Sequence, residues 1–159
     1  MKKILWLACM FMWMAVIFRF SAVPASGSTE MSQSVGRKIC TIFVPGFAEM
    51  DEEAQKELAE RIDFPIRKAA HATEYAVLGI LAAMTFGAFG YAGAKRWTGS
   101  WILSVLYAVS DEFHQLFVPG RSGQLRDVCI DSIGAAFGIL LMYFLLRLLK
   151  WYRQTTKAH

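Results

Sequence analysis

The chain has 159 residues, of which 55% are hydrophobic and only 19% charged, with a net charge of +4. This composition excludes an ordinary water-soluble domain, in which about a quarter of residues are charged. It also argues against a nucleic-acid partner, because the basic residues lie in short segments beside apolar runs, a pattern that orients membrane proteins. We therefore predict one all-α domain, residues 1–159, integral in a membrane and binding no nucleic acid.

Four apolar runs predict transmembrane helices, for which about 17–25 residues are needed to cross the hydrocarbon core. We place the spans at about residues 4–23, 75–94, 97–118 and 128–149, that is Ile4–Val23, Tyr75–Ala94, Trp97–Val118 and Val128–Leu149. The third run is interrupted by Asp111, Glu112 and His114, and we predict that it spans the membrane nevertheless.

The first run has two interpretations. Lys2 and Lys3, the apolar stretch and the following AVPASGS together resemble a secretory signal with a small-residue cleavage site. The length of the run and Arg19 near its end favour a retained anchor instead. We therefore predict that the first run stays in the membrane.

An outer loop of about residues 24–70 follows. SGSTEMSQS, residues 26–34, predicts irregular structure because it is rich in serine. Residues 47–64 alternate acids with apolar residues and predict a short, weakly amphipathic helix on the membrane surface. Its acids are typical of a solvated helix face.

The basic residues predict the orientation of the chain. Four spans put both termini on the same side, together with the segment between the second and third spans. Excess Lys and Arg mark the cytoplasmic side, so we expect both termini in the cytoplasm. The residues in question are Lys2, Lys3, Lys95, Arg96, Arg147, Lys150, Arg153 and Lys157.

Ionisable residues that intrude on the spans gather at the opposite, outer ends. If the third span ends near Val118, Asp111 lies roughly 10 Å deeper, since a helix rises about 1.5 Å per residue. A charge at that depth costs at least a few kcal/mol unless it is paired or faces a wet pocket. We predict a shared outward-facing pocket whose ligand-binding residues are Arg67, His71, Glu74, Tyr75, Asp111, Glu112, His114, Gln115, Gly120, Arg121, Asp127 and Asp131.

Three functions suit such a pocket. Arginines could hold the phosphate or carboxylate of a membrane lipid or cell-wall precursor. An intramembrane enzyme could instead use acid–base chemistry, with Glu74, Asp111, Glu112 and His114 as candidate catalytic residues. The third alternative is a structural ion-pair network that only fixes the helices, although Gly134-x-x-x-Gly138 already supplies a packing face.

We predict neither a cofactor nor a resident metal. A metal-assisted variant of the enzyme stays open, because HATE at 71–74 and DEFH at 111–114 each place a histidine and a carboxylate one helical turn apart. This spacing alone is weak evidence for a metal site.

The same residues carry a family resemblance. RKAAHATEY at 67–75 and SDEFHQLFVPGRSGQLRDVCIDSIGAAFG at 110–138 resemble the signature of VanZ-like membrane proteins, and residues 18–34 are similar to that family's serine-bearing segment. The resemblance implies a small multi-spanning protein of the bacterial cytoplasmic membrane. It also implies a link to reduced susceptibility to teicoplanin, the property for which the family is named, but it implies no reaction.

Overall fold

The computed structural model describes residues 1–156, so Lys157 of the last basic segment lies outside the described part. Residues 1–156 form five α-helices and one short 3-10 helix, without strands, which confirms the all-α prediction. The elements are α1 (Lys2–Ser21), α2 (Ala25–Phe43), η1 (Phe47–Glu49), α3 (Glu52–Ala88), α4 (Gly93–Gln115) and α5 (Leu125–Thr155).

Three of these helices, α1, α3 and α5, are long and apolar enough to cross a membrane. The chain is therefore a multi-pass membrane protein. Helix α4 is long enough, but Asp111, Glu112 and several hydroxyl side chains lower its hydropathy, so the third of the four predicted spans stays a prediction. The helices also end earlier than the second and third predicted spans, at Ala88 and Gln115.

The segment predicted to be irregular is helix α2. Its buried residues, Ser32, Gly36 and Cys40, recur every four positions and form a narrow stripe of small side chains. A stripe with this spacing lies on one helix face and allows close packing, and α2 packs on the first half of α3. The prediction of a loop at residues 26–34 was wrong because serine content outweighed this periodicity.

The helix predicted on the membrane surface at residues 47–64 is not a separate short helix. Residues 52–64 are the beginning of α3, which continues without interruption into the second predicted span. Asp51 caps α3, since its side chain accepts a hydrogen bond of 2.7 Å from the amide of Ala54. The 37 residues of α3 extend about 55 Å at the usual rise of about 1.5 Å per residue, which exceeds the thickness of a hydrocarbon core.

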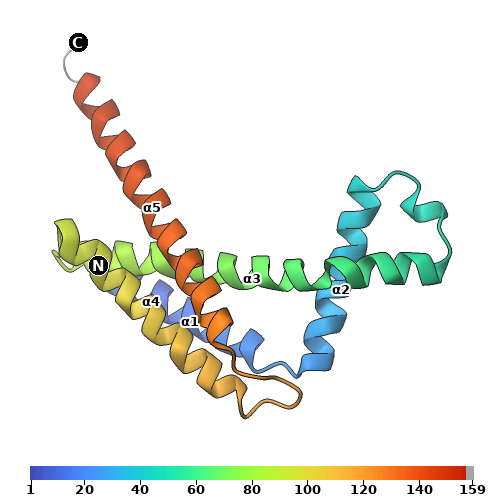
Figure 1. Ribbon diagram of the computed structural model, residues 1–159. Helices are drawn as coiled ribbons and strands as arrows, with labels where there is room; N and C mark the ends of the chain where they lie inside the picture. Colours follow the sequence, from blue (N-terminus) through green and yellow to red (C-terminus); the bar gives the residue numbers. More distant parts are fainter. Residues whose placement is uncertain (157–159) are drawn as a thin grey trace.

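Helix α3 packs against each of the other four α-helices (Figure 1). Its first half packs with α2, and its second half packs with α1, α4 and α5. Tyr75, Leu78 and Ala82 of α3 form the centre of the buried core, together with residues of the three helices around them. Those residues are Met10, Ile17, Ala108 and Ala135.

The crossing of α3 and α5 depends on glycine. A Cβ atom added at Gly134 or Gly138 would overlap the carbonyl oxygen of Ala72 or Ala76, respectively. The two backbones can therefore approach this closely only without side chains on α5. The predicted packing face at Gly134 and Gly138 is confirmed.

Candidate functional site

A polar cavity of about 290 Å³ lies where α2, α3 and the turn between α4 and α5 meet. We call it the basic cavity, because Arg67, Lys68, Arg121 and Arg126 line it together with His71. The turn that closes it needs Gly120, whose φ of +74° is a left-handed conformation that glycine adopts readily. The remaining lining residues are Ala25, Ser28, Phe64, Gln115, Gly120, Ser122, Gln124 and Asp127.

Three of the four cations lie within 4.0 Å of a carboxylate. The weakest of these contacts is that of Arg126, whose Nε is 4.0 Å from Oδ1 of Asp127. Lys68 on α3 contacts both carboxylate oxygens of Asp127 on α5, at 2.7 and 2.6 Å. Arg67 forms an ion pair of 2.7 Å with Asp63, one helical turn earlier on α3. Asp63 also accepts a hydrogen bond from Ser32 of α2. These pairs join α2, α3 and α5 around the cavity.

Arg121 is placed differently, because its partners are neutral. Its Nε donates to the carbonyl of Val23 at 3.1 Å, and its Nη2 to the carbonyl of Phe20 at 3.4 Å. Between residues 1 and 156, no carboxylate lies within 4.0 Å of its guanidinium. A guanidinium carries five N–H donors, so donors remain for an anion.

The electrostatic surroundings of Arg121 agree with this. Burial, and next the positive charge of Arg67, lower the pKa of the Arg121 guanidinium, although nearby carboxylates oppose the shift. A lowered pKa means that the surroundings in the folded protein stabilise the charged guanidinium less well than water does. A bound anion would relieve that deficit.

A second cavity of about 270 Å³ adjoins the first, and Ser28, Arg67, His71 and Arg121 line both. We call it the apolar cavity. At its polar end it is bordered by Ser21, Glu74 and Asp111, and elsewhere by aliphatic and aromatic side chains. Its other lining residues are Ile17, Phe20, Val23, Met31, Ser32, Val35, Ile66 and Ala70.

The two adjacent acids of α4 have different surroundings. Both are buried, with 3% of Asp111 and 5% of Glu112 exposed. Glu112 accepts hydrogen bonds from the Gln124 amide at 2.8 Å and from Gln115 Nε2 at 3.1 Å, so it anchors the turn that begins α5. Asp111 faces the apolar cavity, and its Oδ1 has no hydrogen-bond partner within residues 1–156.

Four predicted site residues line neither cavity. Tyr75 belongs to the core, with its ring 6.3 Å from that of Tyr107. Glu112 is buried and holds the α4–α5 turn. The ring of His114 packs against that of Phe18, with centroids 4.4 Å apart and planes tilted by 34°. Asp131 is fully buried, with Oδ1 3.7 Å from Nδ1 of His71. These four residues surround the site and do not line it.

Several buried polar atoms have no hydrogen-bond partner in the part of the chain that the structure describes. Such atoms are uncommon, because an unsatisfied buried group costs about 1–3 kcal/mol. Three of the residues that carry such atoms line the apolar cavity and come from α1, α3 and α4, namely Ser21, His71 and Asp111. Nδ1 of His71 lies 3.7 Å from Oδ1 of Asp131. Polar residues from three helices that line one cavity are expected of a site that receives a polar group.

The comparisons with known proteins identify the family. The model of the VanZ/LLP1 family matches residues 6–147. The chain belongs to the VanZ/LLP1 family. The resemblance of the 67–75 and 110–138 segments is thereby confirmed, and both cavities lie within the matched range. No curated protein and no solved structure matches the chain.

In this VanZ/LLP1 chain, further residues of the site were not among the predicted ligand-binding residues. Lys68 of α3 pairs with Asp127 of α5, and Asp63 of α3 pairs with Arg67. Ser28 and Ser32 come from α2, in the segment predicted to be a loop. A search of residues 25–43 for helical periodicity would have placed both serines on one face, because they are one turn apart.

The two His–carboxylate pairs of this family member do not assemble into a metal site. Among residues 1–156, no group of three or more His, Cys, Asp or Glu side chains is arranged to hold a metal ion. His71 and His114 lie in different surroundings, beside Asp131 and Phe18 respectively. The geometry therefore does not support the metal-assisted variant.

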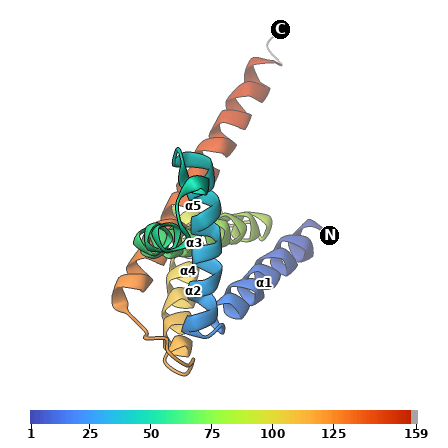
Figure 2. The same cartoon turned by 90° about the vertical axis from the view of Figure 1, so that its right-hand side faces the viewer.

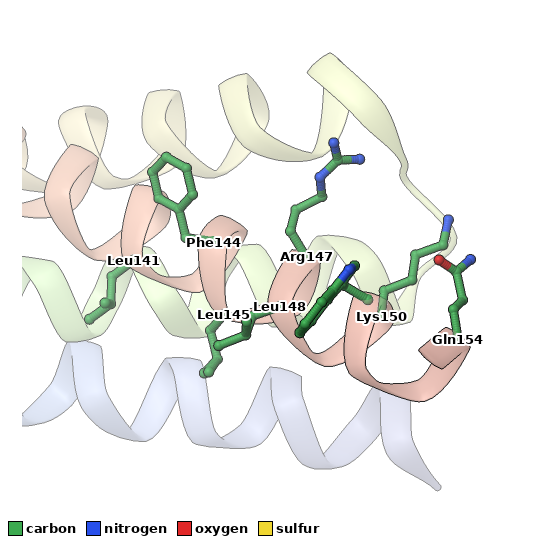
Figure 3. A pocket seen from close by; sticks show the side chains of 8 residues that line it. Leu141, Phe144, Leu145, Arg147, Leu148, Lys150 and Gln154 are labelled. Carbon is green, nitrogen blue, oxygen red and sulfur yellow. The ribbon is translucent and has the colours of Figure 1, made fainter. Parts of the chain in front are cut away.

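Another cavity, of about 770 Å³, lies along the C-terminal half of α5 (Figure 3). Leu141, Phe144, Leu145 and Leu148 line it, with Arg147 and Lys150 towards the end of the helix. Exposed apolar side chains on a membrane helix face lipid tails that are as apolar as leucine. We assign no ligand to this surface.

Proposed function

We propose that this VanZ/LLP1 protein binds the phosphate of a lipid or of a lipid-linked cell-wall precursor in the basic cavity. In this proposal the cavity opens to the outer face of the bacterial cytoplasmic membrane, and both termini are cytoplasmic. Reduced susceptibility to teicoplanin would follow from changing which wall-precursor groups are accessible there.

The observation that carries the proposal is the state of Arg121. Its guanidinium is held in place by two carbonyls, it has spare donors, and no carboxylate of residues 1–156 lies within ion-pair distance. Guanidinium groups bind phosphate or carboxylate with two parallel hydrogen bonds. Arg67 borders the same space and can add a second contact to the anion.

The acids beside Arg121 refine the ligand. Glu74 and Asp111 border the adjoining cavity, and their oxygens accept hydrogen bonds. They would repel a bare dianion but match a phosphate that carries a hydroxyl or amine group. A head group of the phosphatidylglycerol or phosphatidylethanolamine type satisfies both requirements.

The test is lipid retention by the purified full-length chain. Native mass spectrometry would compare bound phosphatidylglycerol in the wild type, Arg121→Gln and the matched control Arg37→Gln, an exposed arginine of α2 outside both cavities. We expect Arg121→Gln to weaken retention about tenfold or more, because a hydrogen bond to a charged group contributes roughly 1.5–3 kcal/mol. Equal retention by the two variants would contradict the proposal.

A second candidate function is acid–base chemistry on the bound group. It is favoured by Asp111 and His71, because both residues line the apolar cavity and each has a polar atom without a hydrogen-bond partner among residues 1–156. A carboxylate and an imidazole facing one substrate can transfer protons in opposite directions. Release of head group by the wild type, lost in Asp111→Asn while lipid retention persists, would support it. Absence of turnover in the wild type would leave the binding function alone.

A further inference from the structure

The apolar cavity lies between two helices that diverge from each other. Helices α1 and α2 both pack on α3 but make few contacts with one another. Figure 2 shows them spreading apart from the short connection at residues 22–24. The apolar cavity is lined mainly by residues of α1, α2 and α3, so it lies between the two diverging helices, and we refer to this space as the groove between α1 and α2.

The rim of this groove is apolar and open. Phe20 on α1 and Met31 and Val35 on α2 line the cavity, yet each has nearly half of its side chain exposed, at 46%, 48% and 47%. Apolar side chains so arranged are compatible with a groove that opens sideways to hydrocarbon. A molecule entering from the bilayer would meet these exposed apolar side chains before Arg67, His71 and Arg121, which are less exposed.

The two cavities together match the two parts of a phospholipid, because the basic cavity suits a phosphate and the apolar cavity suits hydrocarbon. The basic cavity and the apolar cavity meet at Ser28, Arg67, His71 and Arg121. From a phosphate at that junction, a hydrocarbon chain can extend into the apolar cavity, between α1 and α2. The volume of about 270 Å³ lies just below the usual range of about 300–1,000 Å³ for small-molecule sites, so it holds part of one chain and not a whole lipid.

We propose that the groove between α1 and α2 holds one acyl chain of a phospholipid, whose phosphate lies between Arg67 and Arg121. This inference rests on the proposed function and extends it, because it states where the rest of the ligand lies and from which side it enters. The protein then takes its ligand from the bilayer, with the lipid partly extracted from its neighbours, and does not take a water-soluble phosphate.

Chain position can be tested by photo-crosslinking. Full-length protein would be reconstituted with phosphatidylglycerol that carries a diazirine in one acyl chain, and the labelled residues would be mapped by mass spectrometry. We expect enrichment of label at residues 17–35 over residues 140–152, whose exposed apolar side chains on α5 report ordinary lipid contact. Competition with glycerol 3-phosphate, which has the head but no chain, should not remove this enrichment, whereas unlabelled phosphatidylglycerol should.

Two substitutions on α2 sharpen the test. Val35→Trp fills the groove and should abolish the enrichment, while Ile42→Trp, at an exposed position outside both cavities, should preserve it. Met31→Trp serves if Val35→Trp fails to fold, as judged by thermal melting. Uniform labelling of the lipid-exposed helices, or enrichment unchanged by tryptophan at both groove positions, would overturn the inference.

The two proposals fail in distinguishable ways. If Arg121→Gln weakens phosphatidylglycerol retention but label is spread over all lipid-exposed helices, the head-group site stands and the chain position is wrong. If Arg121→Gln retains phosphatidylglycerol as well as the wild type does, the proposed function is wrong, and with it the basis for the chain position. Displacement of label by glycerol 3-phosphate would show a soluble phosphate as the preferred ligand.

Discussion

The crossing of α3 and α5 and the cavities beside α2 are formed by different kinds of residue. At the crossing, Gly134 and Gly138 of α5 lie directly against the backbone of Ala72 and Ala76 of α3. At the cavities, less than three turns away along α3, arginine, histidine and carboxylate side chains face a space of a few hundred Å³. Membrane helices associate through close packing of small residues, so the crossing already supplies what the assembly of α3 and α5 needs.

The ionisable residues therefore require a separate explanation, and it differs among them. Lys68, Asp127 and Glu112 connect helices and the α4–α5 turn through short hydrogen bonds, which fits the structural alternative. Arg121 and Asp111 instead leave donors or acceptors unused within residues 1–156. The cluster thus combines a structural part and a part available to a ligand, and substitutions should separate the two.

The largest effect is expected at the crossing. Gly138→Leu places a side chain where even a Cβ atom would overlap the carbonyl oxygen of Ala76. Because backbone atoms cannot move aside cheaply, we expect a larger cost than the roughly 1–3 kcal/mol of ordinary overpacking. We expect loss of folded protein in detergent, measured by size-exclusion chromatography and thermal melting. Cys129→Leu, at an exposed position on the same helix, is the control and should melt like the wild type. Normal melting of Gly138→Leu would show that the helices do not cross this closely.

A smaller effect on stability is expected at the ion pair between α3 and α5. Asp127→Asn leaves Lys68 without its partner, and because both side chains are only 20% and 10% exposed we expect destabilisation of about 1–3 kcal/mol. The double variant Lys68→Met/Asp127→Leu removes both charges and should recover most of the loss in chemical-denaturation measurements. If the double variant retains phosphatidylglycerol as the wild type does, the pair is structural. Loss of retention in it would instead make Lys68 part of the ligand site.

The smallest expected effect is on drug susceptibility, because it depends on every step from binding to the cell wall. Expression of the wild-type chain in a sensitive strain should raise the inhibitory concentration of teicoplanin, and Arg121→Gln should abolish the increase at equal membrane abundance. Arg126→Ala, which removes a cavity cation with 59% of its side chain exposed, should weaken the increase without abolishing it. Identical inhibitory concentrations for all variants would show that the cavity residues do not contribute to reduced teicoplanin susceptibility.

Much of this organisation could be predicted from the sequence, because membrane helices follow composition closely. The apolar runs gave α1 and the apolar parts of α3 and α5, and the i, i+4 spacings placed Arg67 with His71 and Asp127 with Asp131 on common faces. The glycine pair at 134 and 138 likewise indicated a close approach. These features depend on local periodicity, which a single sequence displays.

The remainder could not be predicted because it depends on contacts between distant residues. Nothing local indicates that Ser32 of α2 meets Asp63 of α3, or that Arg121 reaches the end of α1. The different surroundings of Asp111 and Glu112 could not be predicted either. Adjacent residues on a helix point in different directions, and only the packing of the helices decides which of them lines the cavity. Serine-rich residues 26–34 misled the prediction because their helix is stabilised by α3 and not by local propensity.

The most direct test of the account is the side of the membrane on which the basic cavity opens. Single cysteines would replace Ser122, which lines that cavity, and Lys95, at the opposite end of α4, in a chain whose three native cysteines are replaced by alanine. A membrane-impermeant thiol reagent should label Ser122→Cys in intact cells, and phosphatidylglycerol in proteoliposomes should slow that labelling relative to phosphatidylcholine. It should label Lys95→Cys only after permeabilisation. Labelling of Lys95→Cys in intact cells with protection of Ser122→Cys would contradict an outward-facing head-group site.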